Sequence, residues 1–69
     1  MNHKKLLNSK WTAKNPINKE KHFIVIKVNV NNNEQKIDSI ILQSVLTRRE
    51  YLKTYIEFKN EDDWITGWV

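Results

Sequence analysis

The stretch His22-Phe23-Ile24-Val25-Ile26-Lys27-Val28-Asn29-Val30 decides the fold class of this chain, because its side chains alternate with the two-residue period of a β-strand. One predicted face is apolar throughout and consists of Ile24, Ile26, Val28 and Val30. On the other face, Phe23 and Val25 are expected to be partly buried near the start of the strand. The later residues of that face are polar and are expected to face solvent. We therefore expect a strand from His22 to Val30.

A turn and a returning strand follow this segment. Asn31-Asn32-Asn33-Glu34 favours a hairpin tip, because Asn tolerates the positive φ that tight turns require. The returning strand is expected from about Lys36 to Leu46. Its apolar residues fall on both sides, with Ile37, Ile41 and Val45 on one and Ile40, Leu42 and Leu46 on the other. A central strand covered on both faces, by the N-terminal arm, a helix or a partner chain, would show this pattern.

Two further segments complete the predicted sheet. Lys10-Trp11-Thr12-Ala13 favours a short strand that ends before a loop at residues 14–19, where Pro and Asn occur together. Residues 51–58 favour a fourth strand because of their β-branched and aromatic content. A helix over residues 48–58 remains an alternative, since Leu52, Tyr55 and Ile56 also have helical spacing.

The C-terminal segment predicts a short helix. Asn60 can cap a helix N-terminus, and Glu61, Asp62 and Asp63 would place negative charge at the positive end of its dipole. Gly67 can end the helix in a left-handed conformation and let the last two residues fold back. The predicted class is mostly β (α+β), namely a small antiparallel β-meander of about four strands with a short C-terminal helix packed on the sheet.

The length of 69 residues accommodates one small domain. We expect a flexible N-terminal arm over residues 1–8, in which Leu6 and Leu7 could dock onto the body, and a single domain over residues 9–69. No segment has the apolar length of a signal peptide or of a membrane span, so a cytoplasmic protein without membrane contact is expected.

Four motifs, taken together in order and spacing, resemble one known family. They are Ser9-Lys10-Trp11-Thr12-Ala13, Glu20-Lys21-His22-Phe23-Ile24-Val25, Val45-Leu46-Thr47-Arg48-Arg49, and Trp64 with Gly67-Trp68. The family is the small tryptophan-rich bacterial protein family of unknown function, and the similarity spans nearly the whole chain. Thr54-Tyr55 stands where that family often has a Pro-Trp pair. The resemblance implies a bacterial, cytoplasmic protein and transfers no activity, cofactor or site residue.

Composition argues against most catalytic and metal sites. The chain has no Cys and two His, so the nitrogen and sulfur ligands of a typical zinc site are scarce. A single Gly excludes a glycine-rich phosphate loop, and no Ser or Thr lies in a nucleophile-elbow context. We therefore expect a non-enzymatic protein without a cofactor.

The excess of positive charge points to a polyanion as ligand. The net charge is +4, and the first 35 residues carry seven Lys and two Glu. A small sheet with basic side chains and exposed aromatic rings can contact phosphates and stack bases. The predicted function is thus a small binding module for RNA or another polyanion, with candidate residues Lys10, Lys14, Lys21, Lys27, Arg48, Arg49 and Lys53.

The alternative function is a protein–protein interaction or assembly adaptor. Open sheet edges and a strand with two apolar faces offer surfaces that a homodimer or a partner protein could cover. Trp11 and Trp64 are expected to anchor the core of so small a domain. Trp68, near the end of the chain, is either a third anchor or part of a binding surface.

Overall fold

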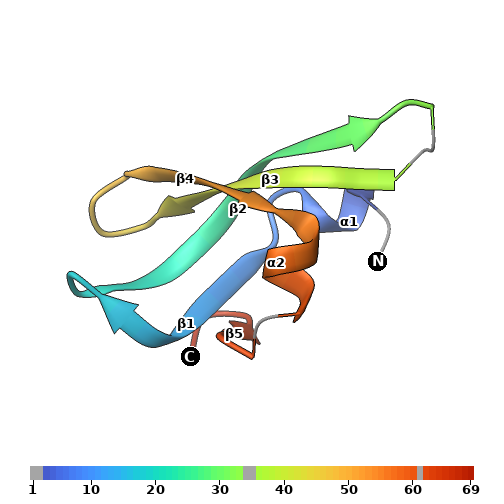
Figure 1. Ribbon diagram of the computed structural model, residues 1–69. Helices are drawn as coiled ribbons and strands as arrows, with labels where there is room; N and C mark the ends of the chain where they lie inside the picture. The colour runs from blue at the N-terminus through green and yellow to red at the C-terminus, as the bar shows by residue number, and fades with distance from the viewer. Residues whose placement is uncertain (1–2, 34–35, 61) are drawn as a thin grey trace.

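The computed structural model describes residues 3–33, 36–60 and 62–69, and its fold is one open antiparallel sheet of five strands in the order β4-β3-β2-β1-β5 (Figure 1). The elements are α1 (His3–Leu6), β1 (Lys10–Ile17), β2 (Glu20–Asn31), β3 (Lys36–Ser44), β4 (Glu50–Thr54), α2 (Tyr55–Asn60) and β5 (Trp64–Thr66). The mostly β prediction is confirmed. The first four strands form the predicted meander, and a fifth strand joins it at the β1 edge.

The central hairpin joins β2 and β3 and projects beyond the rest of the sheet (Figure 1). Asn31 pairs with Lys36 at its end, and the Asn31 side chain accepts a hydrogen bond of 3.0 Å from the Asn33 amide. The expected hairpin is confirmed, although the returning strand ends at Ser44 rather than at about Leu46 and Glu34 of the predicted tip lies outside the described residues.

The buried face of β2 differs from the predicted one. The pairing of β2 with β3 shifts register between Val25 and Lys27, so a bulge at Ile26 moves the following side chains to the opposite face. Phe23 and Val25 are buried before the bulge, and Val28 packs against the same core after it. Simple alternation fails here because it cannot detect an extra residue in one strand.

The first hairpin is longer than expected. The predicted loop at residues 14–19 is wrong for residues 14–17, because β1 continues to Ile17, which pairs with Glu20. Pro16 is accommodated where the β1–β2 register is irregular, so its missing N–H interrupts no regular ladder. Asn18 and Lys19 alone form the turn, with φ of 56° and 64°.

The C-terminal half contains the main error of prediction. Residues 51–58 combine both alternatives: the chain is a strand to Thr54 and a helix from Tyr55. The predicted helix after Asn60 is wrong, because Trp64–Thr66 form β5 and pair with β1. The acidic residues resemble a helix start, but pairing with β1 satisfies the backbone groups of this segment. Glu61 and the side chain of Asn60 lie outside the described part of the chain.

The local sequence explains why α2 begins where it does. The Glu57 amide donates a hydrogen bond of 3.2 Å to the Thr54 hydroxyl, which makes Thr54 the N-cap. Thr54-Tyr55-Ile56-Glu57 also has the spacing of a capping box.

Among the described residues, no helix is long and apolar enough to cross a membrane.

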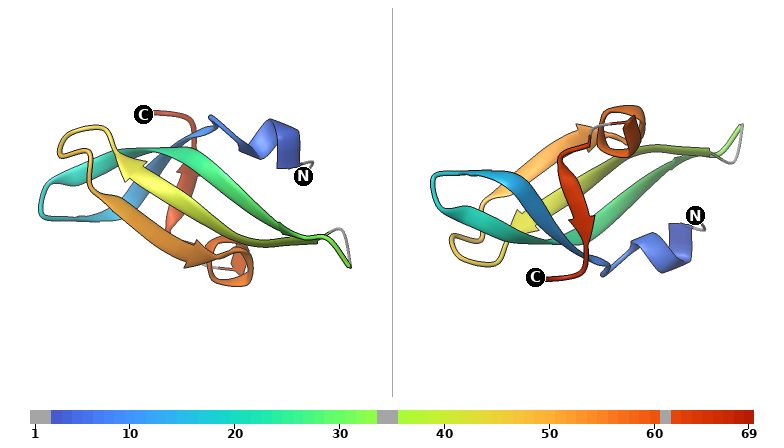
Figure 2. Two further views of the ribbon diagram at one scale, coloured as in Figure 1. Left: turned by 90° about the horizontal axis from the view of Figure 1, so that it is seen from above. Right: turned by 90° about the horizontal axis from the view of Figure 1, so that it is seen from below.

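The two faces of the sheet have different surroundings (Figure 2). The inner face, which packs against α2, carries Trp11, Ala13, Phe23, Val25, Ile40, Leu42, Tyr51 and Trp64. Phe58 of α2 completes this core, and Leu6 of α1 is buried in it with 1% exposure. The outer face carries Lys10, Ile24, Lys27, Ile41 and Leu52.

Candidate functional site

A cavity of about 470 Å³ opens on the inner face, where α2 does not cover the sheet. Strands β1 to β5, the β1–β2 turn and the residue before β5 supply its lining, which consists of Ala13, Asn15, Ile17, Asn18, Glu20, Phe23, Leu42, Tyr51, Lys53, Asp63 and Trp64. This size lies within the range of about 300–1,000 Å³ that small-ligand sites occupy. The cavity is therefore the candidate functional site.

Three aromatic rings contribute to the apolar part of the cavity. Phe23 is central, because its ring lies edge-to-face with Trp64 at 5.2 Å and with Tyr51 at 6.1 Å between centroids. Phe23 and Tyr51 come from strands separated by β3, where Leu42 pairs with Tyr51 and is almost fully buried. The sheet thus holds the rings in fixed mutual positions.

Trp64 occupies its position because β5 pairs with β1. Trp64 lies opposite Ala13 in this pairing, and its ring packs against Phe58 of α2 at 5.7 Å between centroids. Its indole Nε1 is buried and has no hydrogen-bond partner among the described residues. Buried donors normally have a hydrogen-bond partner, so leaving this N–H without one has an energetic cost. The packing of the indole ring must offset that cost.

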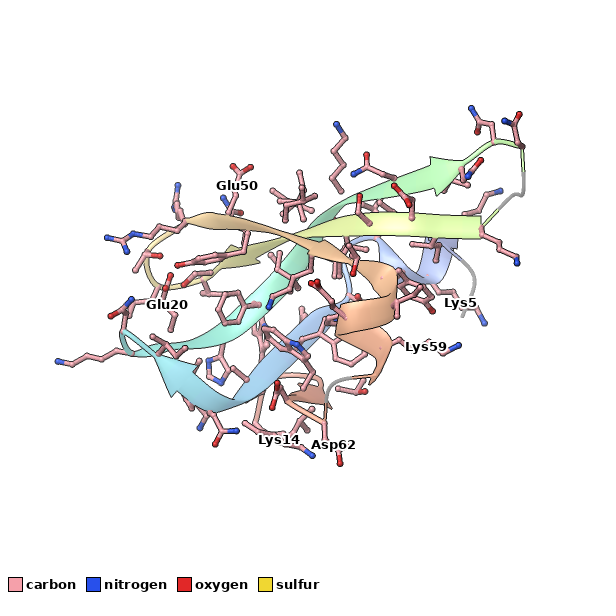
Figure 3. All side chains as sticks on the ribbon, viewed as in Figure 1. Lys5, Lys14, Glu20, Glu50, Lys59 and Asp62 are labelled. Carbon is pink, nitrogen blue, oxygen red and sulfur yellow. The ribbon has the colours of Figure 1, made fainter. Side chains whose placement is uncertain are left out.

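Glu20 is the buried carboxylate of the site, with 4% exposure. One oxygen accepts a hydrogen bond from the Thr47 hydroxyl and the other from the Tyr51 hydroxyl, each at 2.5 Å. Figure 3 shows Glu20 between the β1–β2 and β3–β4 turns, whereas Glu50 points away from it. The hydrogen bond from Thr47, followed by that from Tyr51, lowers the pKa of Glu20 below its ordinary value of 4.5.

The same contact fixes the protonation of Tyr51. Its hydroxyl donates to Glu20, and this hydrogen bond, with desolvation, raises the pKa of Tyr51 above its ordinary value of 10.0. At neutral pH the pair therefore consists of an ionised carboxylate and a neutral phenol.

The charge around the cavity is negative although the whole protein is positive. Glu20 and Asp63 face a single lysine, Lys53, in the lining. Lys53 lies opposite Ile40 in the sheet and is half-buried. Within the described part of the chain, no basic group forms an ion pair with Glu20, since the ion pair found there joins Lys14 and Asp62 at 3.9 Å. The cavity thus combines aromatic walls with a buried carboxylate on which the positive charge of Arg49 acts without forming an ion pair.

The structure does not gather the predicted basic residues on one surface. Lys10 and Lys27 lie on the outer face, and Lys53 lies on the inner face. Lys14 is paired with Asp62 (Figure 3). Lys21 is exposed on β2, and Arg48 and Arg49 lie in the exposed segment between β3 and β4. Only Lys53 lines the cavity.

The predicted tryptophan anchors have three different environments. Trp11 packs edge-to-face on Phe58 at 4.8 Å and donates a hydrogen bond of 2.7 Å to the Ser9 hydroxyl. Trp64 forms a wall of the cavity. Trp68 is 42% exposed, lies under the Lys10 ammonium at 4.9 Å and donates to the Phe23 carbonyl at 2.9 Å. Trp68 therefore attaches the chain end to the sheet without belonging to the buried core.

Sequence reasoning missed Glu20, Thr47 and Tyr51 as a cluster. The predicted meander contained a usable signal, because alternate turns of a meander lie at the same end of the sheet. Glu20 follows the first turn and Thr47 lies in the third, so the topology brings them together.

Among the described residues, no group of three or more His, Cys, Asp or Glu is placed to hold a metal ion.

Comparison with known proteins identifies the family. The sequence profile of the tryptophan-rich protein family DUF2389 matches residues 9–69, and the chain therefore belongs to this family, whose function is unknown. The predicted resemblance is confirmed. No curated protein and no solved structure gives a significant match.

Proposed function

We propose that this protein is a small non-enzymatic binding module whose ligand occupies the cavity on the inner face. The observation that carries the proposal is the combination of a cavity of about 470 Å³, three aromatic rings and the buried carboxylate of Glu20. Ligand sites typically join apolar walls to a few fixed polar groups that orient the ligand.

The protonation of the site favours binding over acid–base catalysis. A general acid or base works best when its pKa lies near the operating pH. The pKa of Glu20 is lowered and that of Tyr51 is raised, so both pKa values lie further from neutral pH than the ordinary values of these groups. The scattered basic residues also supply no continuous surface for a polyanion, which is why the cavity is preferred to the predicted RNA site.

A titration with benzyl alcohol, benzylamine and benzoate tests the proposal, because these probes share one apolar ring and differ in charge. Binding of at least one probe should shift the amide signal of Ala13 and the indole signal of Trp64 in a two-dimensional NMR spectrum. Ala13→Leu, which places a larger side chain in the cavity, should abolish these shifts while the protein stays folded. No shift with any probe, or equal shifts in Ala13→Leu, would overturn the proposal.

A second candidate function, an assembly adaptor, is supported by the β4 edge. β4 pairs with β3 on one side only, and its Leu52 is 69% exposed on the outer face beside Ile41. Exposed apolar edge strands are prone to pair with another chain. Sedimentation at high protein concentration should then show a dimer that Leu52→Lys dissociates, whereas a monomer at all concentrations rules out self-association.

A further inference from the structure

We propose that the cavity selects a positively charged ligand, namely an ammonium or guanidinium group carried on an apolar stem. This inference rests on the proposed binding function and names the ligand class of the same site. Its basis is the juxtaposition of the Glu20 carboxylate with the rings of Phe23, Tyr51 and Trp64.

The first step concerns the capacity of Glu20. The carboxylate oxygens accept hydrogen bonds from Thr47 and Tyr51, the Ser44 hydroxyl also stabilises the ionised form, and an ionised carboxylate offers about four lone-pair sites. Acceptor capacity therefore remains for a donor on a ligand. Arg49 acts on this carboxylate electrostatically but forms no ion pair with it, so a charged group that is 4% exposed still favours a cation in the adjacent cavity.

The second step concerns the aromatic rings. A ring face attracts a cation electrostatically, and combining such rings with a carboxylate is a common way to bind ammonium groups. Two lysines of this protein already contact rings, Lys10 at Trp68 and Lys59 at Tyr55. Neither of those rings lines the cavity, whose ring faces belong to Phe23, Tyr51 and Trp64.

The third step concerns Lys53, the cation in the cavity lining. An anionic ligand would use Lys53 and be repelled by Glu20, whereas a cationic ligand would use Glu20 and be repelled by Lys53. The two ligand classes thus predict opposite effects when either charge is removed. The direction of each change in binding affinity therefore tests the inference, in addition to the size of the change.

The experiment compares the dissociation constants of benzylamine, benzyl alcohol and benzoate by NMR titration at low salt. We expect benzylamine to bind about tenfold more tightly than benzyl alcohol, and benzoate to bind most weakly. Glu20→Gln should remove the preference for benzylamine, and Lys53→Met should strengthen benzylamine binding. Glu50→Gln and Lys27→Met make the same charge changes on the outer face and should alter the constants by less than about twofold.

A second arm asks which source supplies the cation. Agmatine represents a free guanidinium compound, and an acetylated, amidated Gly-Arg-Gly peptide represents an arginine side chain of a partner protein. Agmatine binding alone identifies a small-molecule site, and peptide binding of equal or greater strength identifies a side-chain site. Either result supports the inference, and failure of both cations together with loss of the preference for benzylamine overturns it.

Asp63→Asn keeps the test interpretable if Glu20→Gln does not fold, because Asp63 is an exposed acidic residue of the same lining and its removal should also weaken benzylamine binding. Tighter binding of benzyl alcohol or benzoate than of benzylamine would overturn the choice of a cation and leave the binding function intact. Absence of binding by all probes would instead overturn the binding function itself.

Discussion

Trp64 joins β5, α2 and the cavity, so its substitution tests how much of the fold depends on one ring. Trp64→Ala removes contacts with Phe23 and Phe58 and leaves a void in the core. We expect a loss of about 3 kcal/mol in the free energy of unfolding, a large share of the stability of a domain this small. Urea denaturation followed by circular dichroism measures this loss.

Matched substitutions separate packing from the unpaired indole donor. Trp64→Phe keeps an aromatic ring and removes the buried Nε1 that lacks a partner, so it should cost about 1–2 kcal/mol less than Trp64→Ala. Trp68→Ala, at an exposed ring, should also cost less than Trp64→Ala. A Trp64→Ala protein as stable as Trp68→Ala would show that Trp64 does not anchor the core.

Glu20 makes stability depend on pH in the acid range. Its pKa is lowered in the folded protein, so the folded state binds the proton less readily than the unfolded state. The stabilisation is complete above the ordinary value of 4.5 and disappears as the pH falls through the lowered pKa. Thermal unfolding between pH 7 and pH 2 should show a drop below about pH 4.5 that is smaller in Glu20→Gln. An unchanged acid profile in this variant would contradict the assignment.

At the scale of elements, the β1–β2 turn offers a stabilising substitution. Asn18 and Lys19 both have positive φ, as in a type I′ turn, in which Gly is strongly preferred at the second position. Lys19→Gly should therefore raise the free energy of unfolding by about 0.5 kcal/mol, because Gly adopts this conformation without steric cost. Lys21→Gly, in extended backbone of β2, should lower it by a similar amount. The same loss in both variants would show that the turn is not strained.

The elements that sequence reasoning placed correctly are those set by local signals. The alternation in β2 and the Asn residues of the following turn determine the central hairpin without help from distant residues. The fate of Trp64–Thr66 depends instead on β1, which is about 50 residues away in sequence and supplies hydrogen-bonding partners for a strand. The acidic residues that precede this segment carry no information about its pairing with β1. The sequence therefore predicts a helix where a strand forms.

At the scale of the whole molecule, the site escaped prediction because it is built across turns. The charged residues Glu20 and Lys53 and the ring of Trp64 lie on three separate strands, and only the folded sheet brings them to one cavity. Tryptophan content alone predicted anchors for the core and not a ligand site. The basic residues, in contrast, were prominent in the sequence and are dispersed in space.

This dispersion leads to a prediction for nucleic acid. When a protein binds single-stranded RNA, the logarithm of the binding constant falls with the logarithm of the salt concentration, with a slope of about −0.7 for each phosphate that the protein neutralises. Simultaneous use of all seven predicted basic residues would therefore give a slope near −5. Because Lys10 and Lys27 lie on the outer face and Lys53 lies on the inner face, one strand can reach about two or three of these charges at once. We therefore expect weak binding of a uridine oligonucleotide with a slope near −2.

Fluorescence anisotropy across a salt series measures this slope. Lys10→Gln combined with Lys27→Gln should make the slope less steep by about 1.4 units if the outer face makes the contact, and Lys53→Gln should leave it unchanged. A slope near −5 that all three substitutions reduce would mean that RNA wraps both faces. RNA would then be the principal ligand, and the cavity, which only Lys53 of the basic set lines, would be secondary.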